Sequence, residues 1–190
     1  MKEIITIAKK VNTINKAIAV NMDKFPCMIG YKLLGIAEPV VRRNYDGDEW
    51  FPVIVDEYSG DHTVFVDDDY PLGIYHRLLG KTYSTPKDMQ FGDEKYQLVT
   101  TDMILVCWAF RKYLGSEGAV DTLERIIYSS MDNDITLVSS DFDRLRVFQN
   151  EFRNVQFFLP EDVLLFSMRY RFNYPIMSRE CVDVENICKT

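Results

Sequence analysis

The strongest constraint on the fold lies in residues 96–110, which read as one long strand with two apolar faces. Side chains along a strand point alternately to its two sides. One side of this segment carries Ile104, Val106, Trp108 and Phe110, and the other carries Leu105, Cys107 and Ala109. A strand with two apolar faces is covered by packed layers on both sides. The pattern therefore predicts a buried strand.

A second alternating segment, residues 163–174, has one apolar face and one polar face. Its apolar positions are Phe166, Met168, Tyr170, Phe172 and Tyr174. The positions between them are Ser167, Arg169, Arg171 and Asn173. This alternation predicts a strand with one face in the core and one basic face in contact with solvent.

Two segments have the periodicity of amphipathic helices, with apolar residues three and four positions apart. In residues 2–21 these are Ile4, Ile7, Ala8, Val11, Ile14 and Ile18. In residues 119–131 they are Val120, Leu123, Ile126, Ile127 and Met131. Residues 31–35 fit either a helical turn or a short strand.

A β-hairpin is predicted by residues 50–56 and 62–67, because Gly60 between them can adopt the positive φ of a tight turn. Pro52 donates no hydrogen bond to a ladder, so we expect its strand to lie at an edge or to begin after it. Residues 135–151 predict a further strand that contains a bulge or a short helix.

A chain of 190 residues with 47% hydrophobic content can form one good core and is short for two. We therefore expect a single domain over residues 1–190. Its predicted class is α+β, a mostly antiparallel β-sheet packed by an N-terminal helix and a second helix. The polar segment 81–94 predicts an exposed loop, and residues 175–190 predict a mobile C-terminal arm.

Composition and motifs argue against several classes of function. The net charge of −7, without a long basic run, argues against a protein that grips nucleic acid phosphates. The four cysteines lack CxxC spacing, and the run at 67–69 lacks the alternating ligands of a calcium loop, so we expect no metal or other cofactor. Cys107 lies in an apolar strand, where a thiol is inert. We expect no catalytic residues, no membrane span and a reducing location.

Seven charged residues form a candidate subunit interface. The basic members are Arg144, Arg146, Arg169 and Arg171, and the acidic members are Asp67, Asp68 and Asp69. The arginines could form a basic stripe that pairs with the acids of a neighbouring subunit or touches a nucleic acid backbone. The alternative is an ordinary solvated charged face.

The order of these elements resembles the tail terminator and tail completion proteins of tailed bacteriophages. The segments that carry the resemblance are 103–113, 119–127, 135–147 and 164–172, within a layout that covers about two thirds of the chain. The resemblance implies a ring at the neck or tail of the virion, assembled in the host cytoplasm, that joins other virion proteins around the DNA channel. It implies no catalytic residues, and an acidic ring would let DNA pass without binding it.

Two alternatives from other classes stay open. One is a small intracellular enzyme or ligand-binding domain with a pocket between hairpin and sheet, lined by Tyr70, Tyr75, Tyr83 and His76. The other is a regulatory module that binds one protein partner as a monomer. The chain is also longer than the family it resembles, with residues 81–94 and the tail after Pro175 as apparent additions.

Overall fold

The computed structural model describes residues 7–24, 30–43, 50–57, 59–84, 90–91, 94–114, 118–153 and 159–177. Its helices are α1 (Ile7–Met22), α2 (Arg111–Leu114), α3 (Ala119–Ser129) and α4 (Arg144–Glu151). Its strands are β1 (Tyr31–Arg43), β2 (Trp50–Asp56), β3 (His62–Val64), β4 (Leu72–Tyr83), β5 (Gln90–Phe91), β6 (Glu94–Phe110), β7 (Ile135–Asp141) and β8 (Val163–Met177).

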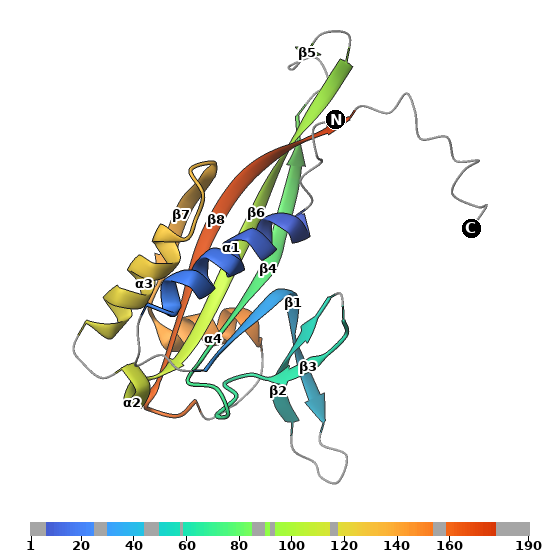
Figure 1. The fold of residues 1–190 in the computed structure, drawn as a ribbon. Coiled ribbons are helices and arrows are strands. Elements are labelled where there is room, and N and C mark those ends of the chain that lie inside the picture. The colour runs from blue at the N-terminus through green and yellow to red at the C-terminus, as the bar shows by residue number, and fades with distance from the viewer. Residues whose placement is uncertain are drawn as a thin grey trace.

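The strands form one sheet in the order β3-β2-β1-β4-β6-β8-β7, with β5 paired to the outer end of β6. Every neighbouring pair is antiparallel except β1 and β4, which run parallel. Helices α1 and α3 lie in front of this sheet and α4 lies behind it (Figure 1). The predicted α+β class and mostly antiparallel sheet are therefore confirmed.

The two faces of β6 are each part of a separate core. Its residues Met103, Leu105, Cys107 and Ala109 pack with α1 and α3 in a front core. Its residues Ile104, Val106, Trp108 and Phe110 pack with α4 and the β2–β3 region in a back core. The two-sided burial that alternation predicted for this strand is confirmed. The solvent-facing side predicted for β8 is confirmed from Arg169 onward. It is wrong at Ser167, which is buried because Val163 and Leu165 on the same face belong to the back core.

Gly73 of β4 packs against the side chain of Trp108 on β6. The two residues are register partners, and the Trp108 indole lies over the position that a Gly73 side chain would occupy. Trp108 is fully buried and packs against Phe65 and Tyr75, with ring centroids 5.7 and 6.5 Å away. Glycine at this position therefore leaves space for the largest side chain of the back core.

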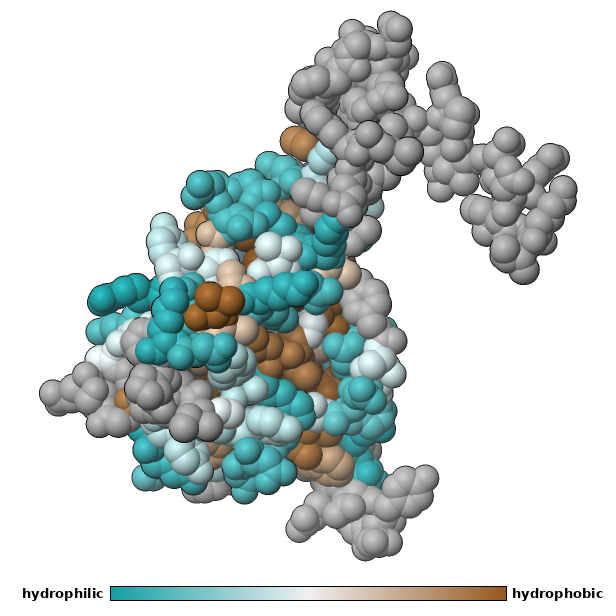
Figure 2. All heavy atoms as spheres, in the orientation of Figure 1, coloured by the Kyte–Doolittle hydropathy of each residue, from teal (hydrophilic) through white to brown (hydrophobic). Residues whose placement is uncertain are grey.

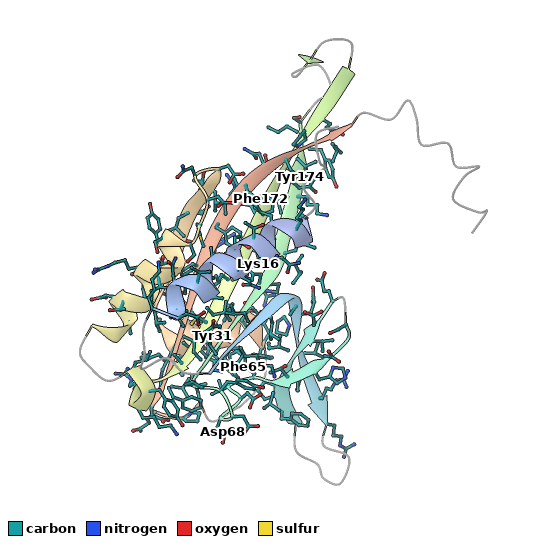
Figure 3. The ribbon with its side chains drawn as sticks, in the orientation of Figure 1. Lys16, Tyr31, Phe65, Asp68, Phe172 and Tyr174 are labelled. Atoms are coloured by element: carbon teal, nitrogen blue, oxygen red, sulfur yellow. The ribbon has the colours of Figure 1, made fainter. Side chains whose placement is uncertain are left out.

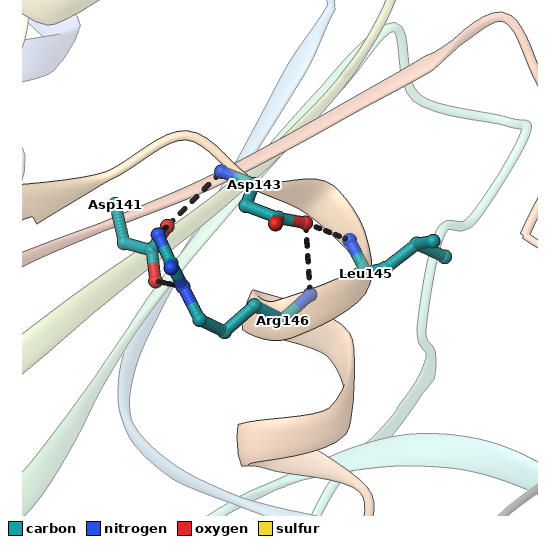
Figure 4. A network of polar contacts seen from close by, with 4 residues as sticks. All are labelled: Asp141, Asp143, Leu145 and Arg146. Atoms are coloured by element: carbon teal, nitrogen blue, oxygen red, sulfur yellow. Dashed lines mark hydrogen bonds and ion pairs between the residues drawn. The ribbon is translucent and has the colours of Figure 1, made fainter.

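A short acidic cap explains α4, which the sequence pattern left undecided between a bulge and a helix. The carboxylate of Asp143 accepts hydrogen bonds from the backbone N–H groups of Leu145 and Arg146, both at 3.1 Å (Figure 4). These bonds satisfy donors that the first turn of a helix leaves free. Val147 and Phe148 then pack into the back core.

Two predictions about chain segments need correction. The expected loop at 81–94 is wrong at both ends. Residues 81–83 belong to β4, residues 90–91 form β5, and residue 94 begins β6. Residues 85–89 and 92–93 lie outside the described part. The expected arm at 175–190 begins too early, because 175–177 complete β8; residues 178–190 are outside the described part. Both strands pair with β6, and this pairing stabilises polar sequences as strands.

The expected edge position of Pro52 is also wrong. Strand β2 lies between β1 and β3, with Pro52 opposite Val41. The β2–β3 register begins one residue later, at Val53. The Pro52 carbonyl accepts a hydrogen bond from the Phe65 N–H at 3.0 Å. An internal strand accommodates proline here because its pairing with β3 begins only at the next residue, so the N–H that proline lacks is not needed.

The other predictions of regular structure are confirmed within the described residues. The first helix begins at Ile7, so Ile4 lies outside the described part, and the second ends at Ser129. The hairpin forms from β2 and β3, and residues 31–35 belong to a strand. No helix among the described residues is long and apolar enough to cross a membrane.

Candidate functional site

The three predicted acids occupy the connection between β3 and β4, which we call the acidic turn (Asp67, Asp68 and Asp69). Asp67 accepts a hydrogen bond from the Asp69 N–H at 3.2 Å, and its other carboxylate oxygen lies 3.5 Å from the Lys32 ammonium. Asp68 and Asp69 are exposed. The described residues offer no ion-pair partner to either of them. One acid is thus used to shape the turn, and two face solvent.

Val66 holds the acidic turn in place through an unusual backbone conformation. Its φ is 60°, a region that costs a β-branched residue roughly 1 kcal/mol or more. The Val66 side chain is nevertheless buried in the back core. Core packing therefore fixes the direction in which the chain leaves β3.

The four predicted arginines lie on the side of the sheet that α4 covers, but most of them bind within the chain. Arg146 makes two hydrogen bonds of 2.6 Å to Asp141, and these bonds lower the pKa of that carboxyl (Figure 4). Arg171 binds both carboxylate oxygens of Asp102, at 2.8 and 3.2 Å. These side chains are only partly available to a second molecule.

The remaining two arginines differ from each other. Arg144 donates to the carbonyl oxygens of Pro160 and Glu161, at 3.0 and 3.2 Å, so no carboxylate neutralises its charge there. Arg169 is exposed and makes no ion pair with any described residue. In the register of β8 it lies opposite Ile104 and Ser139. Of the four predicted arginines, Arg169 is the one best placed to bind a carboxylate of another molecule.

The acidic turn and the arginines of β8 do not meet within one chain. Figure 3 shows Asp68 at one end of the molecule. Phe172 and Tyr174, which belong to the outer half of β8, lie toward the other end. Two oppositely charged surfaces on different parts of a subunit can pair only between subunits.

The back core contains a buried ion pair that the sequence pattern did not reveal. Glu151, at the end of α4, accepts hydrogen bonds from the Tyr75 hydroxyl at 2.7 Å and from Arg77 at 2.6 Å. The Glu151 side chain has no exposed surface. Burial raises the pKa of its carboxyl, although the Arg77 guanidinium and Tyr75 hydroxyl oppose this effect. The network fastens α4 to β4.

Replacing Glu151 by leucine should destabilise the protein by about 3 kcal/mol, because Arg77 and Tyr75 would lose their buried acceptor. Urea unfolding monitored by circular dichroism measures this loss. The matched control is Asp141→Asn, which breaks the exposed pair with Arg146 and should change the unfolding midpoint little. Equal effects of the two substitutions would show that the buried network does not hold α4.

The front core contains a directional chain of hydrogen bonds. The Leu34 carbonyl accepts from Asn15 Nδ2 at 2.8 Å, so the Asn15 oxygen faces His76 Nε2 at 2.9 Å and must accept from it. His76 Nδ1 then lacks a proton and accepts from the Tyr170 hydroxyl at 2.8 Å. Each group in this series of hydrogen bonds can act only as donor or only as acceptor. His76 is therefore the neutral tautomer that carries its proton on Nε2.

The pocket expected for an enzyme or ligand-binding domain does not form from its four predicted residues. Tyr75 and His76 are consecutive in β4 and enter opposite cores. Tyr83 is 55% exposed at the outer end of the same strand. Tyr70 lies beside the acidic turn, with the Lys32 ammonium 4.6 Å from its ring centroid. Alternation along β4 separates these side chains.

Among the described residues, no group of three or more His, Cys, Asp or Glu side chains is placed to hold a metal ion. Cys107 is fully buried, and burial raises the pKa of its thiol. Asn15 and Glu151 are two of the buried polar residues that sequence reasoning missed. Asn15 had a detectable signal, because it interrupts the apolar stripe of α1 next to Ile14.

A scan against models of known protein families finds no match, and a search of curated proteins finds no relative.

Proposed function

We propose that this chain is a structural subunit of a tailed bacteriophage, which assembles into a ring at the neck or tail and joins other virion proteins around the DNA channel. In this proposal the subunit is made in the host cytoplasm and functions in the virion. It needs neither a cofactor nor a catalytic residue. The order of elements that resembles the tail terminator family supports this proposal, as does the shape of the sheet.

The observation that carries the proposal is a ribbon formed by the outer ends of β4, β6 and β8, residues 79–83, 94–102 and 171–177. Strand β6 has 17 residues, on the order of 55 Å of extended chain, whereas α1 has 16 residues, roughly 24 Å of helix. The ribbon accordingly extends well beyond the helices (Figure 1). Such an extension suits a subunit that contacts neighbours in an assembly.

Surface character also supports an assembly role. Most of the face that bears α1 is hydrophilic, with an apolar area below the helix where half-buried residues of β1 lie on the front core (Figure 2). On β4, Leu79 and Tyr83 are 37% and 55% exposed within the ribbon. The acidic turn and Arg169 provide unlike surfaces on one subunit, as a contact that closes a ring by rotation requires.

We expect the purified protein, or the protein mixed with its virion partners, to form closed rings with a central hole. Light scattering gives the native mass, and negative-stain images of the same sample show the ring. Arg169→Glu should weaken the contact between subunits of the ring and lower the native mass. Arg125→Glu, an exposed arginine of α3 on the other side of the sheet, is the matched control.

A charge exchange sharpens this experiment. Combining Arg169→Glu with Asp68→Lys should restore the assembly, because opposite charges again face each other between subunits. A protein that stays monomeric with every partner, or that binds one small metabolite as a monomer, would contradict the ring. A monomer that forms a defined complex with one protein would favour a regulatory module.

A further inference from the structure

The two edges of the sheet differ in a way that the ring does not explain. Strand β3, at one edge, has three residues and leads within a few positions into the acidic turn. Strand β7, at the other edge, has seven residues, and the first six carry no charge. Proteins normally protect an open edge by keeping it short or by placing charges and prolines on it. By length and charge, β3 is protected and β7 is not, although β7 carries a bulge at Val138, which is another way to protect an edge.

Strand β7 is also accompanied by exposed apolar side chains. Within the described residues it pairs only with β8. Val138, its middle residue, lies where the register with β8 shifts and is 49% exposed. Phe142, directly after the strand, is 45% exposed, and Leu145, in the first turn of α4, is 57% exposed. A strand edge with unpaired backbone groups and apolar neighbours can accept another strand.

We propose that a second copy of this chain pairs with this edge, with β7 of one copy antiparallel to β7 of the other and Val138 at the two-fold axis. Centring on the middle residue pairs the whole strand. Thr136 of one copy then opposes Ser140 of the other, and Leu137 opposes Ser139. No like charges face each other along the pairing, which would otherwise destabilise it.

Charged residues beyond the two ends of β7 also favour a second copy of this chain as the partner of this edge. The turn before β7 carries Asp132 and Asp134, which bind Lys10 and are still 48% and 54% exposed. After the strand, Asp141 is bound to Arg146 and Asp143 caps α4, whereas Arg144 donates to backbone carbonyl oxygens. Pairing centred on Val138 places Asp132 of each copy opposite Arg144 of the other. The edge is thus complementary to itself at these positions, as a two-fold contact requires.

This contact is independent of the ring, because it uses a different edge and a different symmetry. Rotation alone gives a single ring, whereas rotation combined with a two-fold axis gives two rings back to back. If the ring does not form, the two-fold contact by itself gives a dimer. The native mass therefore reports on the two contacts separately.

Two matched valines test the proposal. Val64 on β3 and Val138 on β7 are both 49% exposed and lie on opposite edges of the sheet. We expect Val138→Lys to halve the native mass at equal protein concentration, and Val64→Lys to leave it unchanged. Far-ultraviolet circular dichroism checks that both variants are folded. Unchanged mass in Val138→Lys, or an equal decrease in both variants, would overturn the proposal.

A cross-link tests the register itself. Residues directly opposite each other in an antiparallel pair have Cα atoms about 4.5–5.5 Å apart, within the range that a disulfide spans. Val138→Cys should therefore give a covalent dimer on mild oxidation, seen on a non-reducing gel. Wild type and Val64→Cys are the controls for the native cysteines. If Val138→Cys gives no covalent dimer, or if the controls give the same amount of dimer, this pairing is excluded. The bulge at Val138 would then be a feature that prevents strand pairing at this edge.

Discussion

Replacing Gly73 by alanine should lower the free energy of unfolding by at least about 3 kcal/mol, because the new methyl group overlaps a buried indole. A Cβ at this position would lie 1.9 Å from Cζ2 of Trp108 and 2.2 Å from Cη2. The indole is fully buried, and Phe65 and Tyr75 pack against it in the back core, so moving it would disturb these contacts. Urea unfolding, or loss of soluble protein on expression, measures the effect.

The matched control for this substitution is Gly80→Ala in the same strand. No atom lies within 4 Å of a Cβ built at Gly80, so this variant should stay within roughly 0.5 kcal/mol of wild type. A double variant identifies the cause. Trp108→Leu should cost stability alone, yet combined with Gly73→Ala it should cost less than the sum of the two. Additive effects would show that the indole is not the source of the strain.

Acid should destabilise the protein through His76. Burial lowers the pKa of this imidazole to about 3, from an ordinary value of 6.5. Between pH 6.5 and 3, His76 is therefore protonated in the unfolded state but stays neutral in the native state. The stabilisation is complete above pH 6.5 and is lost as the pH falls toward 3, at roughly 1.4 kcal/mol per pH unit.

A His76→Gln variant separates this effect from the titration of carboxylates. The variant should be less stable than wild type at neutral pH, because Asn15 and Tyr170 lose an ideal partner. Its disadvantage should shrink between pH 6.5 and 4, since it has no imidazole to protonate. His62→Gln, which removes an exposed imidazole, is the control. If the unfolding curves of His76→Gln and wild type stay parallel over this range, His76 does not set the acid limit.

Sequence reasoning was most successful where one periodicity extended over many residues. The alternation from Ile104 to Phe110 predicted both the strand and the two cores that cover it. It was least successful at α4, whose eight residues include few apolar ones. The cap at Asp143 is a local signal for that helix, although only the packing of Val147 and Phe148 makes the helix stable.

The candidate site shows the same division. The sequence indicated which charged residues share a strand face, and alternation placed Arg169 and Arg171 on the polar side of β8. It did not indicate that Asp102 binds Arg171, because this pair joins positions 69 residues apart. The availability of each arginine therefore depends on strand pairing and not on its own segment.

The sequence by itself determined the local elements and the direction in which each side chain of the long strands points, because alternation and helical periodicity act over neighbouring residues. Tertiary structure decided which polar groups enter the core. Asn15, His76 and Tyr170 come from three elements, and their hydrogen bonds span 61 and 94 residues. Tertiary structure also decided that β7 is an edge, since the order of the described strands leaves its outer side without a pairing strand among them.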